Sequence, residues 1–344
     1  MIIKKIESLM SETNLDDKIF NEIALEVFEH QYKNNPIYQR IAKQSKKPSH
    51  WQEIPLLNID IFKKAEVICS NTKIQEIFYS SGTTSKEKSK HYISNKQIKL
   101  YEKSLYTSFS QAFNLEENKE EIEYIILTTS LEENPNSSLI YMFDYIKKKS
   151  LSKGDYFIKN NEIEVERLTN KLIQASKDKK KCLIVGTAFS LLSYLEQTPK
   201  DLIFDLKKDS MIMETGGFKG KYREIPKQDF YALLSKKFQI TEKNIIGQYG
   251  MSELGCQYYD SFDNNKRFKI FKPWFRTRIL RPDDLSQEVP IGESGIIAHY
   301  DLTNIDSASF ILSGDLGIKL DNNRFDLISR LPKISLKGCS LFYE

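Results

Sequence analysis

A short hydroxyl-rich stretch between Tyr79 and His91 is the part of the sequence best suited to hold phosphate. Residues 80–85 read Ser-Ser-Gly-Thr-Thr-Ser, and lysines follow at positions 86, 88 and 90. Hydroxyls and backbone N–H groups donate to phosphate oxygens, lysine supplies charge, and glycine lets the backbone approach closely or take positive φ. The candidate phosphate ligands are Ser80, Ser81, Gly82, Thr83, Thr84 and Lys88. A solvated Ser/Thr-rich turn is the alternative, and the rest of the chain must decide between the two.

The four cysteines are scattered along the chain without paired spacing. This pattern suggests neither a disulfide framework nor a zinc site. Cys69 and Cys182 lie in apolar stretches and are predicted to be small core residues, and packing is also the favoured role of Cys256. Cys339 follows Lys337 and Gly338, a setting that would favour the nucleophilic thiolate, although a near-terminal cysteine with no role is the alternative.

Other candidate residues follow predicted strands. Glu253, in a turn after the strand predicted at 244–249, could place a carboxylate where ligands of open α/β sheets gather and where a hard cation prefers oxygen. The alternatives are a solvated turn residue for Glu253, a turn aspartate for Asp315 and a core aromatic for Tyr249. His91 is a further candidate for ligand contact, and Phe189 for the wall of an acyl pocket or the core.

Strand and helix patterns alternate through the first 260 residues, which predicts a layered α/β domain with parallel pairings. We expect strands at residues 66–70, 76–80, 91–94, 123–129, 181–186, 209–214 and 244–249. We expect helices between 2 and 43 with a break near Pro36, at 59–63, and then at 95–109, 139–148, 166–176, 187–195 and 226–238. Shorter strands at 276–280, 295–299, 317–320 and 324–328 predict a β-rich subdomain. The predicted domains are therefore an α/β core over 1–260 and a β-rich segment over 261–344.

Composition gives no argument for a nucleic-acid or membrane partner. The 344 residues carry 51 Lys and Arg against 47 Asp and Glu, a small positive excess. No apolar run approaches the roughly 20 residues of a membrane span. The N-terminus lacks the apolar region of a signal peptide, so the expected location is the cytoplasm.

Five stretches, in order, resemble the motifs of the adenylate-forming ligases, the acyl-CoA synthetase and luciferase-type superfamily. Their phosphate loop is usually Thr-Ser-Gly-Thr-Thr-Gly-x-Pro-Lys-Gly, and here it reads Ser80-Ser-Gly-Thr-Thr-Ser-Lys-Glu-Lys-Ser89. Lys88 falls on the motif's lysine, while Ser85, Glu87 and Ser89 replace its Gly, Pro and Gly. The other stretches are Gly216-Gly217, Tyr249-Gly250-Met251-Ser252-Glu253, Ser313-Gly-Asp315 and Ser329-Arg330.

The resemblance implies ATP and Mg²⁺ as cofactors and assigns roles to these residues. Gly216 and Gly217 would hold the adenine, Tyr249 would stack on it, and Asp315 would take the ribose hydroxyls. Glu253 would bind the magnesium ion. Gly250, Ser252 and Arg330 belong to the same motifs and complete the implied nucleotide site.

The end of the chain resembles the acyl-protein synthetase (LuxE-like) branch of this superfamily. The stretch Lys337-Gly-Cys-Ser-Leu341 lies close to Glu344, and we expect the protein to lack the mobile C-terminal domain of full-length ligases. The branch implies that a carboxylic acid, expected to be a fatty acid, becomes an acyl-adenylate and is then passed to Cys339. It also implies an acyl reductase as partner. The alternatives are an acyl- or aryl-CoA ligase in which Cys339 is incidental, and a non-catalytic nucleotide-binding scaffold.

Overall fold

The computed structural model describes residues 1–80, 88–115, 121–149, 153–217, 225–264 and 266–330. The chain forms two compact units, and each is described by itself. The central unit comprises residues 108–250, and the split unit comprises residues 1–107 and 251–344. The predicted division at residue 260 falls near the second boundary between these units, whereas the first, inside helix α5 (Gln97–Phe113), has no counterpart in that prediction.

The central unit is built on parallel strands in the order β10-β9-β8-β4-β5. These strands are β4 (Ile122–Leu127), β5 (Gly154–Tyr156), β8 (Lys181–Thr187), β9 (Met211–Thr215) and β10 (Ile245–Tyr249). The helices between them are α6 (Ser138–Lys149), α7 (Val165–Lys177), α8 (Ala188–Gln197) and α9 (Lys227–Phe238). The short strands β6 (Ile158–Lys159) and β7 (Glu162–Ile163) form a hairpin, and η2 (Glu242–Asn244) precedes β10.

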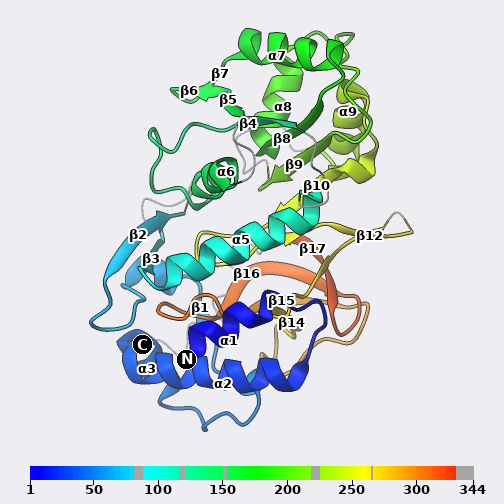
Figure 1. The fold of residues 1–344 in the computed structure, drawn as a ribbon. Helices are drawn as coiled ribbons and strands as arrows, with labels where there is room; N and C mark the ends of the chain where they lie inside the picture. Colours follow the sequence, from blue (N-terminus) through cyan, green and yellow to red (C-terminus); the bar gives the residue numbers. More distant parts are fainter. Residues whose placement is uncertain (81–87, 116–120, 150–152, 218–224, 265, 331–344) are drawn as a thin grey trace. The chain divides into compact units, whose positions relative to one another are not determined.

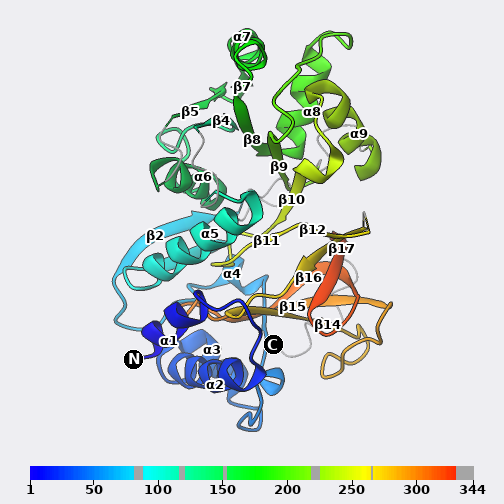
Figure 2. The ribbon, with the colours of Figure 1, turned by 45° about the vertical axis from the view of Figure 1, so that its right-hand side comes forward.

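Helices cover both faces of this sheet. Figure 2 shows α8 and α9 on one side of β8 and β9 and α6 on the other. Every residue of β4 is buried, as expected for a parallel strand with both faces covered. One apolar core joins α7, α8 and α9 to the strands through side chains such as Leu172, Leu191 and Leu234. The predicted parallel α/β arrangement is confirmed here.

The split unit contains an antiparallel sheet in the order β12-β13-β17-β16-β15-β14. Its strands are β12 (Ser261–Asp263), β13 (Lys266–Ile270), β14 (Phe275–Leu280), β15 (Ser294–Asp301), β16 (Phe310–Lys319) and β17 (Arg324–Arg330). Strand β1 (Leu57–Asn58) pairs in parallel with β16, β2 (Ile74–Tyr79) pairs with β3 (Lys90–Ser94), and β11 (Tyr258–Tyr259) precedes β12. The strands predicted at 276–280, 295–299 and 324–328 lie within β14, β15 and β17, and the one predicted at 317–320 overlaps the end of the longer β16.

Three N-terminal helices, α1 (Ile2–Leu9), α2 (Asp17–Asn34) and α3 (Pro36–Ala42), lie side by side (Figures 1 and 2). The Asn35 side chain accepts from the N–H groups of Ile37 and Tyr38, both at 3.1 Å, and Pro36 occupies the first helical position. The cap and the proline that follows it start a new helix immediately, so the predicted break near Pro36 consists of Asn35 alone. Two short turns follow, η1 (Trp51–Glu53) and α4 (Ile61–Lys64).

The strand predicted at residues 66–70 is wrong. This segment forms no strand, because two of its backbone donors are bonded to other parts of the chain. The Cys69 N–H donates to the Asp306 carbonyl and the Ser70 N–H to the Asn34 carbonyl, both at 2.7 Å. No helix among the described residues is long and apolar enough to cross a membrane.

Candidate active site

In the central unit, polar and glycine residues gather where the parallel strands end. The chain runs from β4 to β5 on one side and then returns to β8 on the other side of β4. This reversal lies between β4 and β8, and ligands of open α/β sheets commonly bind outside the carboxyl ends of the strands. Thr215 ends β9 and Tyr249 ends β10, and the two strands are hydrogen-bonded neighbours.

The backbone after β9 suits the close approach of a planar ligand. Gly216 has φ of 71°, a conformation that favours glycine, and a Cβ added at Gly217 would meet no atom within 4 Å. Tyr249 is 7% exposed, so most of its ring is packed within the protein. In the described part of this unit, the backbone at Gly217 is therefore open, and it follows the strand that pairs with β10, which Tyr249 ends.

In the split unit, the residues flanking the predicted phosphate loop contact the predicted metal ligand. The Ser89 N–H donates to Ser80 Oγ at 3.0 Å, and the Ser89 carbonyl accepts from the Ser80 N–H at 3.1 Å. The Ser89 hydroxyl donates to Glu253 Oε1 at 2.5 Å, and both side chains are buried. Lys88, the predicted phosphate cation, is exposed beside them. Ser80, Ser89 and Glu253 thus form one connected group.

His91 fixes the turn that carries Glu253. Its Nδ1 donates to the Ser252 carbonyl at 2.7 Å, so its Nε2 is the acceptor for the Ser307 hydroxyl at 2.8 Å. Burial lowers the pKa of this ring to about 4, which keeps it neutral and suits this tautomer. The Asn304 side chain donates to the Glu253 carbonyl at 2.8 Å. His91 is therefore a support for the turn, with both ring nitrogens committed to protein partners.

Asp315 lies in the middle of β16, opposite Arg330 of β17 in the strand register. Its N–H contacts Ser313 Oγ at 3.2 Å, and the Ser313 hydroxyl donates to the Ile297 carbonyl at 2.8 Å. Asp315 is half-buried. The predicted ribose ligand is held on a strand and not on a turn.

Several predicted site residues lie outside the part of the chain that the structure describes. They are Ser81, Gly82, Thr83 and Thr84 of the loop and Cys339 near the C-terminus. Gly250 joins the two units in sequence between Tyr249 and Met251.

The three described cysteines are buried, as predicted. Burial raises the pKa of both the Cys69 and the Cys182 thiol to about 12, so neither is a ready nucleophile. Phe189, by contrast, is 37% exposed at the start of α8 and is not a core residue. Its exposure leaves the predicted role in an acyl pocket open.

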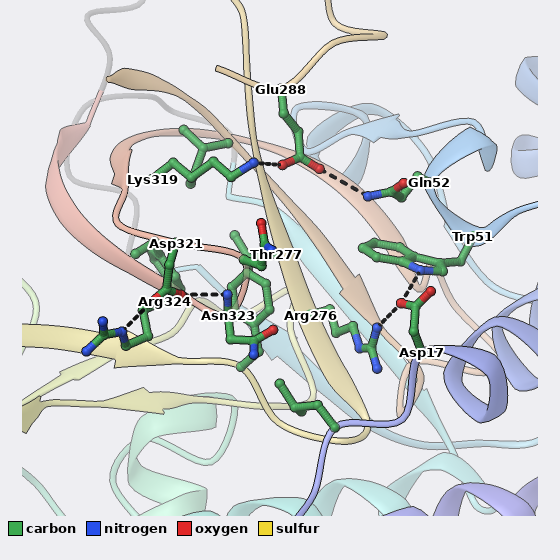
Figure 3. Close-up of a pocket in the computed structure, with 15 residues that line it drawn as sticks. Asp17, Trp51, Gln52, Arg276, Thr277, Glu288, Lys319, Asp321, Asn323 and Arg324 are labelled. Atoms are coloured by element: carbon green, nitrogen blue, oxygen red, sulfur yellow. Dashed lines mark hydrogen bonds and ion pairs between the residues drawn. The ribbon is translucent and has the colours of Figure 1, made fainter. Parts of the chain in front are cut away.

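A cavity of about 410 Å³ in the split unit is lined by none of the predicted site residues. Figure 3 shows that its charged side chains face one another in pairs. The Lys319 ammonium contacts Glu288 at 2.6 Å, and the Arg276 guanidinium contacts Asp17. The Lys319 and Arg276 cations of this cavity are therefore already paired with carboxylates that line it.

The sequence profile of the family described as "Acyl-protein synthetase, LuxE" matches residues 3–344. The chain belongs to the LuxE acyl-protein synthetase family. A long-chain-fatty-acid–luciferin-component ligase of Vibrio harveyi is 20% identical over 369 residues, which cover 98% of this chain and 94% of that protein. The predicted family and enzyme class are confirmed.

Solved structures show which fold this LuxE family member has. An open conformation of 2-hydroxyisobutyryl-CoA ligase aligns with a TM-score of 0.69 at 13% identity, covering 91% of this chain and 74% of that one. A long-chain-fatty-acid-CoA ligase from Archaeoglobus fulgidus aligns with a TM-score of 0.52 at 13% identity, covering 77% and 53%. The fold is that of the adenylate-forming ligases, as predicted. The family description makes this chain an acyl-protein synthetase, an enzyme that joins an acyl group to a protein.

Sequence reasoning missed the supports of the site. Ser89 stands where the general phosphate-loop motif has glycine, and that departure was the available signal, because a new hydroxyl invites the question of its acceptor. Asn304 and Ser307 lie more than 50 residues from Glu253, so nothing local in the sequence pointed to them.

Proposed function

We propose that this LuxE acyl-protein synthetase activates a fatty acid with ATP and moves the acyl group to its own Cys339. The family match extends over residues 3–344 and so includes Cys339. The name of the Vibrio harveyi relative specifies a long-chain fatty acid as that protein's substrate class. The observation that carries the proposal is the buried contact between Ser89, at the end of the phosphate loop, and Glu253.

The first half-reaction joins the acid to the nucleotide. A carboxylate oxygen attacks the α-phosphorus, and pyrophosphate leaves with the electron pair of the broken P–O bond. We assign phosphate binding to Ser80, Ser81, Gly82, Thr83 and Thr84, with Lys88 supplying positive charge. The adenine would lie along Gly216 and Gly217 beside Tyr249, and the ribose hydroxyls would be held by Asp315.

Glu253 is the residue that we propose to hold Mg²⁺, which when bound would offset phosphate charge. Its donor chemistry fits, because a carboxylate oxygen is a ligand that a hard cation prefers. The Ser89 hydroxyl bonds to Oε1, and the Asn304 amide fixes the backbone carbonyl. These two contacts orient the carboxylate before any ligand binds.

In the second half-reaction the Cys339 thiolate attacks the acyl carbonyl carbon. A thioester C–S bond forms, the C–O bond to the phosphate breaks, and AMP leaves with that electron pair. The three cysteines that the structure describes are all buried, and burial supports Cys339 as the acceptor because a buried thiol is poorly placed to receive an acyl group.

Labelled palmitate and ATP test the acceptor. We expect a protein-bound label that hydroxylamine removes, that is absent in Cys339→Ser and that persists in the matched control Cys182→Ser. Fatty-acid-dependent ATP–pyrophosphate exchange should continue in Cys339→Ser, because adenylation precedes the transfer. Label that appears on added coenzyme A and never on the protein would favour the acyl-CoA ligase instead.

Glu253→Gln tests the metal role. The amide keeps the shape of the side chain and can still accept from Ser89, but it lacks the charge that attracts a divalent cation. Exchange activity should fall by at least about a hundredfold, as it does for comparable losses of electrostatic stabilisation, while the melting temperature stays near that of the parent. Normal exchange in this variant would refute the assignment of Glu253.

A thioester on the enzyme is an intermediate, so a second acceptor must take the acyl group. We propose an acyl reductase protein, the partner that the resemblance implies. A chase experiment tests this: the acyl label on the isolated enzyme should be lost as aldehyde or alcohol when a reductase and its reductant are added. A label that stays on the enzyme through the chase would refute the reductase as acceptor.

A further inference from the structure

Three side chains that can ligate a metal converge in the split unit, apart from the predicted nucleotide residues. His30 comes from α2, Cys69 from the segment between α4 and β2, and Asp306 from the connection between β15 and β16. His30 Nε2 lies 3.0 Å from Asp306 Oδ1 and 3.8 Å from Cys69 Sγ. All three ligand atoms lie within 4.8 Å of one another.

The ring of His30 lies between the other two ligand atoms of the cluster. The Asn34 amide nitrogen, which donates to the His30 carbonyl at 2.8 Å, faces His30 Nδ1 at 3.3 Å. With Nδ1 as the acceptor, Nε2 is the ring atom that faces both Asp306 Oδ1 and Cys69 Sγ. A cation at the centre would satisfy all three atoms at once.

The ligands are held in place by the surrounding backbone. The Cys69 N–H donates to the Asp306 carbonyl and the Ser70 N–H to the Asn34 carbonyl, each at 2.7 Å. The Ser94 hydroxyl donates to Asp306 Oδ2 at 2.6 Å, which orients the carboxylate. Such partners of a ligand are typical of built metal sites.

We propose that His30, Cys69 and Asp306 form a binding site for a borderline-soft divalent cation of the Zn²⁺ class. Thiolate, imidazole and carboxylate is a ligand set that zinc accepts and that hard cations such as Mg²⁺ do not seek. Around a tetrahedral zinc ion the N–O and S–N separations are roughly 3.3 and 3.6 Å from its usual bond lengths. The observed 3.0 and 3.8 Å need movements of only a few tenths of an ångström.

The burial of the three residues leaves one side of the site open. The side chains of Cys69 and Asp306 are buried, whereas that of His30 is 33% exposed. A cation can therefore enter past His30, and solvent can supply a fourth ligand. The spacing of the cysteines along the sequence suggested no zinc site because two of the ligands are not cysteines and the three come from distant segments.

Binding requires two proton movements. Burial, with a contribution from the Asp306 charge, raises the pKa of the Cys69 thiol to about 12, so the thiol proton must be released to solvent as the metal–sulfur bond forms. The His30 ring must shift its proton from Nε2 to Nδ1. The exposed Asn34 side chain can then turn its amide oxygen toward Nδ1, so that this oxygen accepts the hydrogen bond from the protonated Nδ1.

Equilibrium dialysis of the full-length, chelator-treated protein against Zn²⁺ tests the site, with Co²⁺ as a spectroscopic probe of the thiolate. We expect one bound equivalent and a sulfur-to-cobalt absorption band. Both should be lost in Cys69→Ser and in His30→Gln. Both should persist in Cys182→Ser and Cys339→Ser, which remove thiols elsewhere in the chain.

Two further measurements separate loss of the ligand from loss of the fold. Zn²⁺ should raise the melting temperature of the parent but not that of Cys69→Ser, whose melting curve without metal shows whether the variant is folded. Ser94→Ala keeps all three ligands but loses the bond to Asp306, and its affinity should fall by about ten- to a hundredfold. The proposal is overturned if the parent binds no stoichiometric metal, or if a folded Cys69→Ser retains it.

Discussion

Two buried histidines make the split unit sensitive to mild acid. His91 is 1% exposed and His299 is 0% exposed. Burial lowers the pKa of His91 from 6.5 to about 4 and that of His299 from 6.5 to about 3. Between about pH 6 and pH 5, these two histidines are therefore protonated in the unfolded chain and neutral in the folded unit. Each one lowers the free energy of unfolding as the pH falls.

Asp301 acts in the opposite direction. It is completely buried, and burial raises its pKa from 3.8 to about 6, although its carboxylate accepts from Thr303 and from the N–H groups of Gly255 and Cys256. Over the same interval the folded unit binds one proton that the unfolded chain does not, and this stabilises the fold as the pH falls. The net difference is one proton, or about 1.4 kcal/mol lost per pH unit of acidification.

The unit can be followed separately because both tryptophans of the chain, Trp51 and Trp274, lie in it. Urea unfolding monitored by tryptophan fluorescence at about pH 5, 5.5 and 6 gives the slope. His91→Gln should bring the slope near zero, because the contributions of His299 and Asp301 then cancel. A parental slope in His91→Gln would refute the assignment of a buried, neutral His91.

Two further substitutions test contacts seen in the structure. Ser89→Ala removes a hydrogen bond to the buried Glu253 carboxylate, worth about 1.5–3 kcal/mol, so it should lower the melting temperature and raise the Mg²⁺ concentration for half-maximal pyrophosphate exchange. The control Ser110→Ala removes a buried hydroxyl with no partner among the described atoms and should do neither; equal effects in both variants would argue against the contact. Gly295→Ala would place a Cβ 2.3 Å from the Leu280 carbonyl oxygen, and in urea unfolding we expect a loss of about 1–3 kcal/mol; parental stability would contradict the strand packing.

The central unit was predictable because its elements depend on local pattern. β4 is apolar except for Glu123 and is buried along its whole length, and the helices between strands show apolar faces at helical spacing. The strands expected at 181–186 and 244–249 lie at Lys181–Thr187 and Ile245–Tyr249. In such a layered sheet the side-chain pattern indicates both where a strand lies and that it is buried, so a single sequence is enough to predict both.

The segment at residues 66–70 shows where this reasoning failed. Its apolar residues fit a strand, but the structure uses it as a bridge between α2 and the connection that follows β15. Val67 and Cys69 are buried, as a strand would also bury them, so hydrophobicity could not distinguish the two. The deciding interactions are backbone hydrogen bonds to Asn34 and Asp306, which lie far away in sequence.

The segment at residues 301–309 explains why the supports of the site escaped sequence analysis. It is rich in Asp, Asn, Thr and Ser, a composition typical of a solvated loop, yet all nine residues are buried. Its side chains serve as internal partners: Asp301 holds the backbone after Glu253, Asn304 and Ser307 hold the Glu253 turn and His91, and Asp306 belongs to the proposed metal cluster. Buried polar groups need partners, and those partners come from α2, β3 and α5. A polar run of this kind can therefore be buried when distant segments of the chain supply hydrogen-bond partners for it. A single sequence does not show which distant segments lie close enough to do so.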